Sequence, residues 1–313
     1  MDQLDADILR RTQFPSSLME ERPTYYSIAK SMKQNPSTVR NRISKMKESG
    51  VLKDIVAIPD PGILNMKRIA VLLSCDYKTS EAIIREMGKF RSLMGIHRAV
   101  HSTIGLIMEL MYREEEELES DLTALKEISE TVQIMMKVDF APRCSVKDGK
   151  RYMNILDRII RDPMAGIDEI SKDIGINRKT TAKRIRELTH ERAISFEPAL
   201  SSYMNSYGML FILSIPVPDE QKEIMKTMMA GIMGDSLLLM KDQFSGILTF
   251  LGHTQNMHEM NLVRESLKEK FGTDELEPII AFDSTWQYSL SMQNGIRAIM
   301  GLGKEINELP QNL

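Results

Sequence analysis

The strongest pattern in the chain is a helical one between residues 35 and 52, where the sequence reads NPSTVRNRISKMKESGVL. At helical spacing one face is apolar, and the opposite face carries hydroxyl, amide and cationic groups. The apolar face consists of Val39, Ile43 and Met46. Asn35 is suited to the N-cap, Pro36 to the first turn and Gly50 to the end, so the pattern predicts a helix of about three to four turns.

A shorter helical segment, TYYSIAKSM, precedes this helix by only a few residues. Two helices joined by a tight turn, the second of which displays polar and cationic side chains, are typical of a helix-turn-helix. The apolar, β-branched stretch VLKDIVAIPDPG follows and is interrupted at Pro59 and Pro61. It predicts a strand and a turn, which would form the wing of a winged helix.

The same pattern recurs 142 residues later, where the sequence reads NRKTTAKRIRELTHERAI. Six residues of the first segment match identical residues of the second: Ile28, Lys30, Asn35, Thr38, Arg42 and Ile43 correspond to Ile170, Lys172, Asn177, Thr180, Arg184 and Ile185. The second apolar face would consist of Thr181, Ile185 and Leu188. Self-similarity at a fixed distance indicates tandem units.

Two further stretches predict sheets covered by helices. Residues 68–140 follow the order strand, helix, strand, strand, helix, strand, and the same order recurs over residues 210–285. This βαββαβ order is that of a ferredoxin-like sheet with two helices on one face. Residues 104–112 are apolar at nearly every position. A strand of that kind needs cover on both faces, so we expect the face away from the helices to pack on another sheet.

The chain of 313 residues therefore fits two units of about 150 residues, each with two modules. The predicted fold class is α+β, with two winged helix-turn-helix domains alternating with two ferredoxin-like domains. The expected boundaries are 1–62 and 63–143 for the first unit, 144–150 for a linker, 151–207 and 208–285 for the second unit, and 286–313 for a helical tail.

The net charge of −3 does not favour a general polyanion binder, but the charges are unevenly distributed. Residues 30–53 hold seven Lys or Arg and one Glu, a charge of +6, and residues 171–192 hold seven basic and three acidic residues, a charge of +4. The rest of the chain therefore sums to −13. Basic helices on an acidic body would orient the molecule on DNA, because cations release phosphate counterions while the body is repelled.

A helix-turn-helix that ends in SGVLKDIVAIPDP and is followed by a βαββαβ domain resembles the leucine-responsive regulator/AsnC family of prokaryotic transcription regulators. The resemblance implies that the α/β domain, the RAM domain of that family, binds a small-molecule effector and mediates oligomerisation. A tandem chain would form an intramolecular pseudo-dimer with sheet packed on sheet, or pair with a second chain as a homodimer. Ser102 and Gly105 replace the Gly-x-x-Asp turn of the family, so the sequence names no effector.

The expected partner is double-stranded DNA. The residues expected to read base edges are Ser37, Thr38, Arg40, Asn41 and Lys45 in the first unit and Lys179, Thr180, Lys183 and Arg186 in the second. Those expected to hold phosphates are Arg42, Lys47, Lys53, Arg178 and Arg184. Because the two sets differ, a pseudo-dimer should prefer an asymmetric DNA site.

Two alternatives remain from the sequence. Haem-precursor (siroheme-type) decarboxylases share the architecture, and His97, Arg98 and His101 lie on one predicted strand. The aromatic and His-rich segment that those enzymes carry has no counterpart here, so we expect no enzymatic activity. A winged helix can also serve as a protein-docking module, which would keep the fold without DNA binding.

No cofactor or metal is expected. Cys75 and Cys144 stand alone, and His253 and His258 have no acidic or cysteine partner at ligand spacing. There is no apolar run long enough to span a membrane, and the N-terminus lacks the apolar core of a signal peptide. The sequence therefore predicts a cytoplasmic protein that does not contact membranes.

Overall fold

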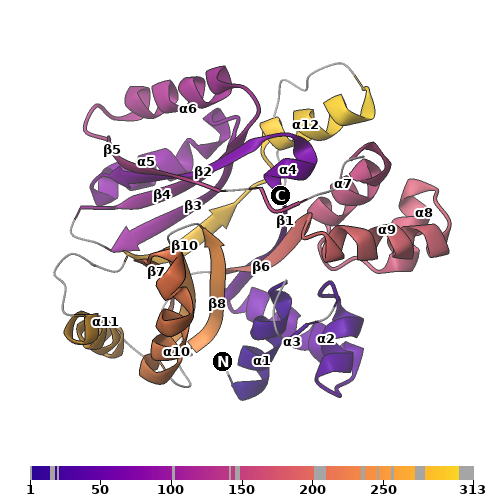
Figure 1. Cartoon of the computed structure of the whole chain (residues 1–313), viewed down its shortest axis with the longest axis horizontal. Helices are drawn as coiled ribbons and strands as arrows, with labels where there is room; N and C mark the ends of the chain where they lie inside the picture. Colours follow the sequence, from indigo (N-terminus) through magenta and orange to yellow (C-terminus); the bar gives the residue numbers. More distant parts are fainter. Residues whose placement is uncertain are drawn as a thin grey trace.

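The fold of this chain, described in a computed structural model, combines two three-helix units with one large sheet (Figure 1). The described residues are 2–14, 18–19, 21–100, 103–140, 142–144, 149–200, 209–233, 237–244, 247–254, 257–271 and 279–302. His101 and Ser102, which the sequence singles out, lie outside these ranges.

The first helical unit consists of α1 (Gln3–Thr12), α2 (Tyr25–Ser31) and α3 (Pro36–Glu48). Each helix begins at a side-chain cap, because its first amides have no partner within the helix. The caps are Asp2, Thr24 and Asn35. The Asn35 side chain accepts a hydrogen bond from the Ser37 amide at 2.9 Å, which confirms the predicted start of the helix.

The second helical unit consists of α7 (Met153–Arg161), α8 (Ile167–Ile174) and α9 (Arg178–His190). The turn before the third helix has a positive φ in both units, 54° at Lys33 and 67° at Gly175. A residue just after the third helix also has a positive φ in both units, 72° at Gly50 and 52° at Arg192. Each unit thus places one basic residue in the left-handed region, at a cost of about 1–2 kcal/mol, and uses glycine at the other position.

The strand after each third helix pairs with its counterpart in the other unit. Strands β1 (Leu52–Pro59) and β6 (Ile194–Leu200) form an antiparallel two-stranded ribbon, with Ala57 opposite Phe196. The prediction that the strand after α3 forms the wing of its own unit is corrected. Within the described residues, neither β1 nor β6 folds back on its own unit. After β1 the chain enters the short helix α4 (Pro61–Leu64), with Pro61 in its first turn, and the open edge of β1 is satisfied by β6.

The sheet consists of two halves with the same strand order. The first half contains β2 (Lys67–Ser74), β3 (Leu93–Val100), β4 (Leu106–Tyr112) and β5 (Gln133–Asp139), with helices α5 (Tyr77–Arg85) and α6 (Glu115–Ile128). The second half contains β7 (Met209–Pro216), β8 (Leu237–Phe244), β9 (Ile247–Thr254) and β10 (Ile279–Trp286), with helices α10 (Lys222–Met233) and α11 (Met257–Phe271). The orders β5-β2-β4-β3 and β10-β7-β9-β8 are both ferredoxin-like.

The two halves join edge to edge. Strand β3 pairs with β10 in antiparallel register, with Ala99 opposite Ala281, so the eight strands form one continuous sheet. The sequence predicts contact between sheet faces and misses this junction. It forms because β3 and β10 are the edge strands of their halves and carry open hydrogen-bonding groups. On the face of β4 away from α5 and α6, Met111 is nevertheless buried and Ile107 packs against buried Ala70 and Leu72 of β2, as expected for residues 104–112.

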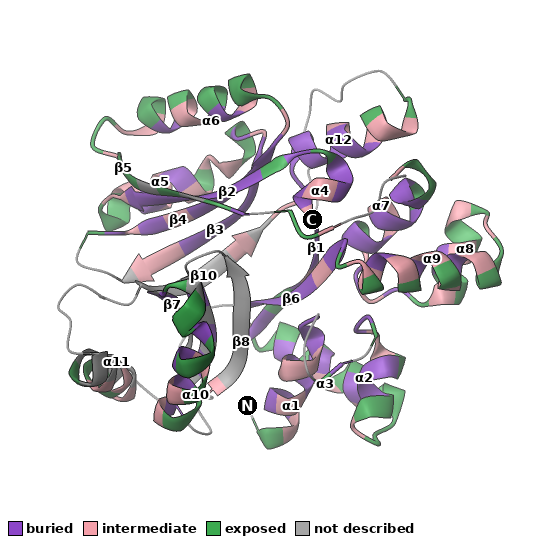
Figure 2. Cartoon of the chain, in the orientation of Figure 1, coloured by how far each residue is buried: buried purple, intermediate pink, exposed green. Residues whose placement is uncertain are grey.

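One hydrophobic core connects the two helical units. It contains Ile8 and Ile43 from the first unit, Ile159 and Leu188 from the second, and Phe196 from the ribbon. Figure 2 shows the buried stripes of these helices turned toward the ribbon, with exposed residues on the outer faces. The two units are therefore packed as one body.

The segment predicted as a tail belongs to the same core. Helix α12 (Leu290–Met300) packs against α7 and the short helix α4 (Pro61–Leu64), and it buries Met292 and Ile296. The Tyr288 hydroxyl donates a hydrogen bond to Asp157 of α7 at 2.8 Å. The C-terminal segment thus holds the second helical unit, a role that its sequence pattern does not predict. None of the described helices is long and apolar enough to cross a bilayer.

Candidate nucleic-acid interface

Helix α3 presents the two faces that its sequence predicts. Val39, Ile43 and Met46 are buried with at most 4% exposure and pack into the core of the first unit. The side chains expected to read bases lie on the other face and are exposed or half-buried: Ser37, Thr38, Arg40, Asn41 and Lys45. Periodicity alone therefore identified which side of this helix is accessible.

Arg40 is held in place by an aromatic ring. Its guanidinium carbon lies 4.9 Å from the centroid of the Tyr25 ring, which belongs to the first helix of the motif. A contact of this kind contributes about 0.5–1 kcal/mol at an exposed site. Because the ring occupies one face of the guanidinium, the N–H donors in its plane remain suited to bidentate contact with a guanine.

Arg42 connects α3 to α1. Its Nη1 atom lies 2.6 Å from an Asp2 oxygen and 3.3 Å from an Asp5 oxygen. The hydrogen bond to Asp2 raises the pKa of Arg42, and the pKa of Asp2 is lowered by the Asp5 amide and then by Arg42. The structure thus places Arg42, expected to hold a phosphate, in an ion pair behind the reading face.

Lys47 and Lys53, also expected to hold phosphates, both have contacts within the chain. The Lys47 Nζ lies 2.6 Å from an Asp54 carboxylate oxygen. The Lys53 Nζ donates a hydrogen bond to the Thr285 hydroxyl of β10 at 3.2 Å. Both lysines are exposed. Lys47 lies near the C-terminal end of α3 beside the ribbon, and Lys53 lies where the ribbon meets β10 of the sheet.

Helix α9 has the same design but different charges. The Asn177 side chain caps it by accepting from the Thr180 amide at 2.9 Å. The predicted outer residues are exposed or half-buried: Arg178, Lys179, Thr180, Lys183, Arg184 and Arg186. Arg178 is ion-paired with Asp168 of α8, and Lys183 lies 3.9 Å from Glu187 on the same helix. Part of the basic face of α9 is therefore neutralised by neighbouring acids.

Buried Arg22 ties the first unit to the second. Its guanidinium donates to the Pro163 carbonyl at 3.3 Å and to the Ala165 carbonyl, both in the loop between α7 and α8. Burial lowers the pKa of Arg22 to about 10. A second tie is the pair of backbone hydrogen bonds between Phe14 and Phe196, at 3.0 and 2.8 Å. These contacts fix the units that carry α3 and α9 relative to each other.

A buried charge cluster lies on the first half of the sheet, on the face away from its helices. The Glu109 carboxylate pairs with Arg68 and lies 3.1 Å from the His97 Nε2, and all three residues are less than 9% exposed. Burial by itself raises the pKa of Glu109, but the charge of Arg68 and the hydrogen bond to His97 bring it down to about 2. The Nε of Arg68 is buried without a hydrogen-bond partner among the described residues. The sequence singles out His97 but gives no indication of its two partners.

Arg98, the neighbour of His97, points to the opposite face. It pairs with Glu81 of α5, and its guanidinium lies 5.0 Å from the Tyr77 ring centroid. The two residues that the sequence associates on one strand are thus separated by the sheet, as side-chain alternation requires. Among the described residues, no group of three or more His, Cys, Asp or Glu could hold a metal ion.

Searches with this chain find relatives by structure alone. No family model and no curated protein matches it. The crystal structure of the siroheme decarboxylase NirDL is 13% identical, covers 95% of this chain and 98% of its own, and has a TM-score of 0.52. The same enzyme in complex with an iron-uroporphyrin III analogue is 14% identical, covers 97% and 100%, and has a TM-score of 0.50. AsnC of E. coli is 17% identical over 44% of this chain and 91% of its own, with a TM-score of 0.29.

The expectation that the missing aromatic and His-rich segment excludes an enzyme is wrong. A decarboxylase has a similar fold over nearly the whole of this chain. The expectation rested on a missing aromatic and His-rich segment around one hairpin, whereas the likeness concerns the path of the entire backbone. At 13% identity the likeness establishes the fold alone, and the function has to be argued from the side chains of this chain.

Proposed function

We propose that this chain is a transcription regulator that binds double-stranded DNA through α3 and α9, as a pseudo-dimer of two non-identical reading units. One observation carries the proposal. Two helices with corresponding caps and corresponding turn geometry expose their basic faces, while a shared core fixes their units in one body. Dimeric helix-turn-helix proteins bind two half-sites in this way.

The register of the β1–β6 ribbon supports a two-fold relation between the units. Ile55 pairs with Pro198, and Val56 pairs with Glu197. Glu197 and Pro198 lie 142 residues after Ile55 and Val56, so each of the two residues pairs with the repeat counterpart of its neighbour. A pairing that exchanges counterparts is what a two-fold axis produces. The helices follow the same rule, because α1 packs on β6 and α7 packs on β1.

Within this proposal the first unit reads sequence and the second adds a different half-site. Arg40 is suited to guanine and Asn41 to adenine, while Lys45 approaches a base edge or a phosphate. Lys179, Lys183 and Arg186 take the groove side of α9. An asymmetric operator with half-sites about one helical turn apart, or a multiple of it, is the expected target.

Selection of bound duplexes from a random DNA pool at about 150 mM salt tests the proposal, because nonspecific attraction is already weakened there. We expect an enriched motif with two unlike halves. Scattering mass should equal one chain, 35.8 kDa, if the pseudo-dimer is intramolecular, and twice that if two chains pair. Absence of enrichment above the starting pool would contradict DNA reading.

We infer a second candidate, decarboxylation of a carboxylate-rich tetrapyrrole, from the buried cluster of Arg68, Glu109 and His97. Arginine binds carboxylates and histidine transfers protons near neutral pH, and NirDL, named as a siroheme decarboxylase, supplies a full-length fold precedent. Anaerobic incubation with siroheme followed by chromatography tests it. Loss of side-chain carboxylates from siroheme would favour this candidate if it depends on His97. His97→Gln should then be inactive, and the control His258→Gln should be active. Unchanged siroheme would exclude it.

A further inference from the structure

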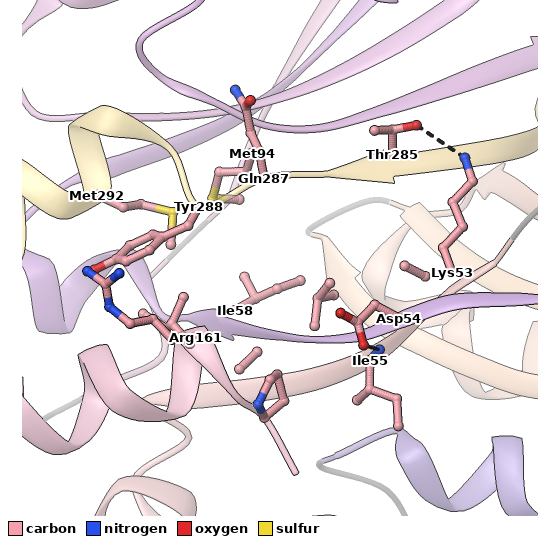
Figure 3. A pocket seen from close by; sticks show the side chains of 15 residues that line it. Lys53, Asp54, Ile55, Ile58, Met94, Arg161, Thr285, Gln287, Tyr288 and Met292 are labelled. Atoms are coloured by element: carbon pink, nitrogen blue, oxygen red, sulfur yellow. Dashed lines mark hydrogen bonds between the residues drawn. The ribbon is translucent and has the colours of Figure 1, made fainter. Parts of the chain in front are cut away.

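A cavity of about 230 Å³ lies between the ribbon, α7, β10 and the start of α12 (Figure 3). Its lining comes from segments far apart in the sequence. Ile58 of β1, Met94 of β3, Pro163 after α7 and Met292 of α12 provide apolar surface. Because these elements belong to both helical units and to the sheet, the cavity lies where the three parts of the molecule meet.

Cationic groups lie at the two ends of the cavity, and Asp54 and Gln287 are also among its polar lining residues. At one end the Lys53 Nζ donates to the Thr285 hydroxyl at 3.2 Å. At the other end the Arg161 guanidinium lies 5.3 Å from the Tyr288 ring centroid. Figure 3 shows Ile58 between these two groups. The arrangement suits a molecule with an apolar middle and polar ends.

Arg161 is the residue best placed to bind an anion. It is the last residue of α7, and it gives its Nε and Nη2 to the Asp157 carboxylate at 3.0 and 3.3 Å. A guanidinium has five N–H donors, so this pair uses only some of them. The remaining donors lie in the same plane, which is the geometry that recognises a carboxylate.

The volume limits the size of the occupant. A cavity of about 230 Å³ lies just below the range of about 300–1,000 Å³ that is usual for drug-sized ligands, so it suits a smaller molecule. None of Arg68, Glu109 and His97 lines this cavity, so it is distinct from the buried cluster assigned to the decarboxylase candidate.

We propose that this cavity binds a small organic acid, with its apolar body against Ile58 and Met94 and its carboxylate on Arg161. Both reading units adjoin the site. Asp54 lines the cavity and holds Lys47 of α3, while Arg161 ends the first helix of the second unit. A ligand in the cavity would therefore contact segments attached to both reading units. Binding of the ligand itself does not require DNA.

The experiment uses the full chain labelled with ¹³C at methionine methyls and 3-phenylpropanoate as the probe. Met94→Leu and Met292→Leu assign the two cavity signals, and Met229, buried in α10 away from the cavity lining, is the internal reference. We expect the cavity signals to shift saturably with a dissociation constant of about 1 mM or lower, while Met229 is unchanged. Absence of a saturable shift at the cavity methyls would overturn the site.

The matched neutral probe, 3-phenylpropanamide, tests the class of ligand. It should bind about 10-fold more weakly than the acid, and Arg161→Gln should reduce acid binding to the level of the amide. Lys78→Gln, an exposed change on α5 outside the lining, should leave both affinities unchanged. Equal binding of acid and amide to the unsubstituted protein would overturn the carboxylate assignment, even if Arg161→Gln failed to fold.

Discussion

Helices α3 and α9 occupy corresponding places in their units, but they arrange their charges differently. The paired cations of α3 contact acids on other elements, Arg42 with Asp2 and Lys47 with Asp54. Arg178 of α9 likewise pairs with Asp168 of α8. The helices differ at one position of the repeat, where α9 carries Glu187 in its interior and α3 carries Lys45, while the acid of α3, Glu48, is its last residue. An acid behind a reading helix orients it, whereas an acid on the helix repels phosphate. We therefore expect α3 to contribute more affinity and specificity than α9.

The largest effect should follow from removing the base-reading pair of α3. Arg40→Ala with Asn41→Ala should cost about 1–3 kcal/mol per lost base contact and relax preference at the corresponding positions, because both groups offer bidentate contacts. Competition binding with substituted duplexes measures this. The matched change on α9, Lys179→Ala with Lys183→Ala, should cost less. An equal or greater loss from α9 would reverse the assigned ranking.

The next effect comes from reversing the charge at the position that distinguishes the helices. Lys45→Glu gives α3 the acid that α9 carries, and we expect affinity for DNA to fall about 10-fold, with a salt slope lower by about 1–2. Titrations at several salt concentrations measure both quantities. Lys78→Glu, an exposed reversal on α5, is the control and should change neither. A slope that stays the same for Lys45→Glu would place this side chain outside the interface.

The reciprocal change should strengthen α9. Glu187→Gln removes the negative charge but keeps an acceptor for the Tyr152 hydroxyl, which donates to Glu187 at 2.9 Å. We expect affinity to rise about threefold, since one like-charge repulsion near the phosphates is removed. Glu119→Gln on the exposed surface of α6 is the control. Unchanged binding in both variants would mean that α9 does not approach DNA.

The boundaries of the helices could be predicted because they depend on local chemistry. Asn35 before Pro36 and Asn177 before Arg178 fix the starts of α3 and α9 through side-chain caps, and apolar spacing fixes which face is buried. These features use contacts between residues that are close in the chain. The strand order within each half joins more distant residues, such as Ile69 and Asp139, but it could be predicted because the succession βαββαβ is typical of a ferredoxin-like sheet.

The features that sequence reasoning missed depend on distant contacts. The β1–β6 ribbon, the β3–β10 junction and the hydrogen bond from Lys53 to Thr285 join segments more than 100 residues apart. No periodicity encodes such partners. The cluster of Arg68, Glu109 and His97 was missed for the same reason, because each residue alone resembles an ordinary strand residue.

The smallest effect tests whether Arg42 acts on the fold or on DNA. Arg42→Met removes the ion pairs with Asp2 and Asp5, and we expect a loss of about 0.2–1 kcal/mol in unfolding free energy, because the pairs are partly exposed. Since the pKa of Asp2 is depressed in the folded state, this stabilisation is present above its ordinary value of 3.8 and is lost as the pH falls below it. The difference between the variant and the unsubstituted protein should therefore shrink on acidification.

Arg184, the counterpart of Arg42 on α9, supplies the matched control. Arg184→Met should change stability less and with no dependence on Asp2, because α7, the counterpart of α1, begins at Tyr152 without a capping acid. Urea unfolding at neutral pH and near pH 3.5 measures both variants. If Arg42→Met weakens DNA binding without changing stability, its partners in α1 are incidental and its main contact is a phosphate. If it changes stability alone, α3 owes its orientation to α1, which α9 achieves without such a pair.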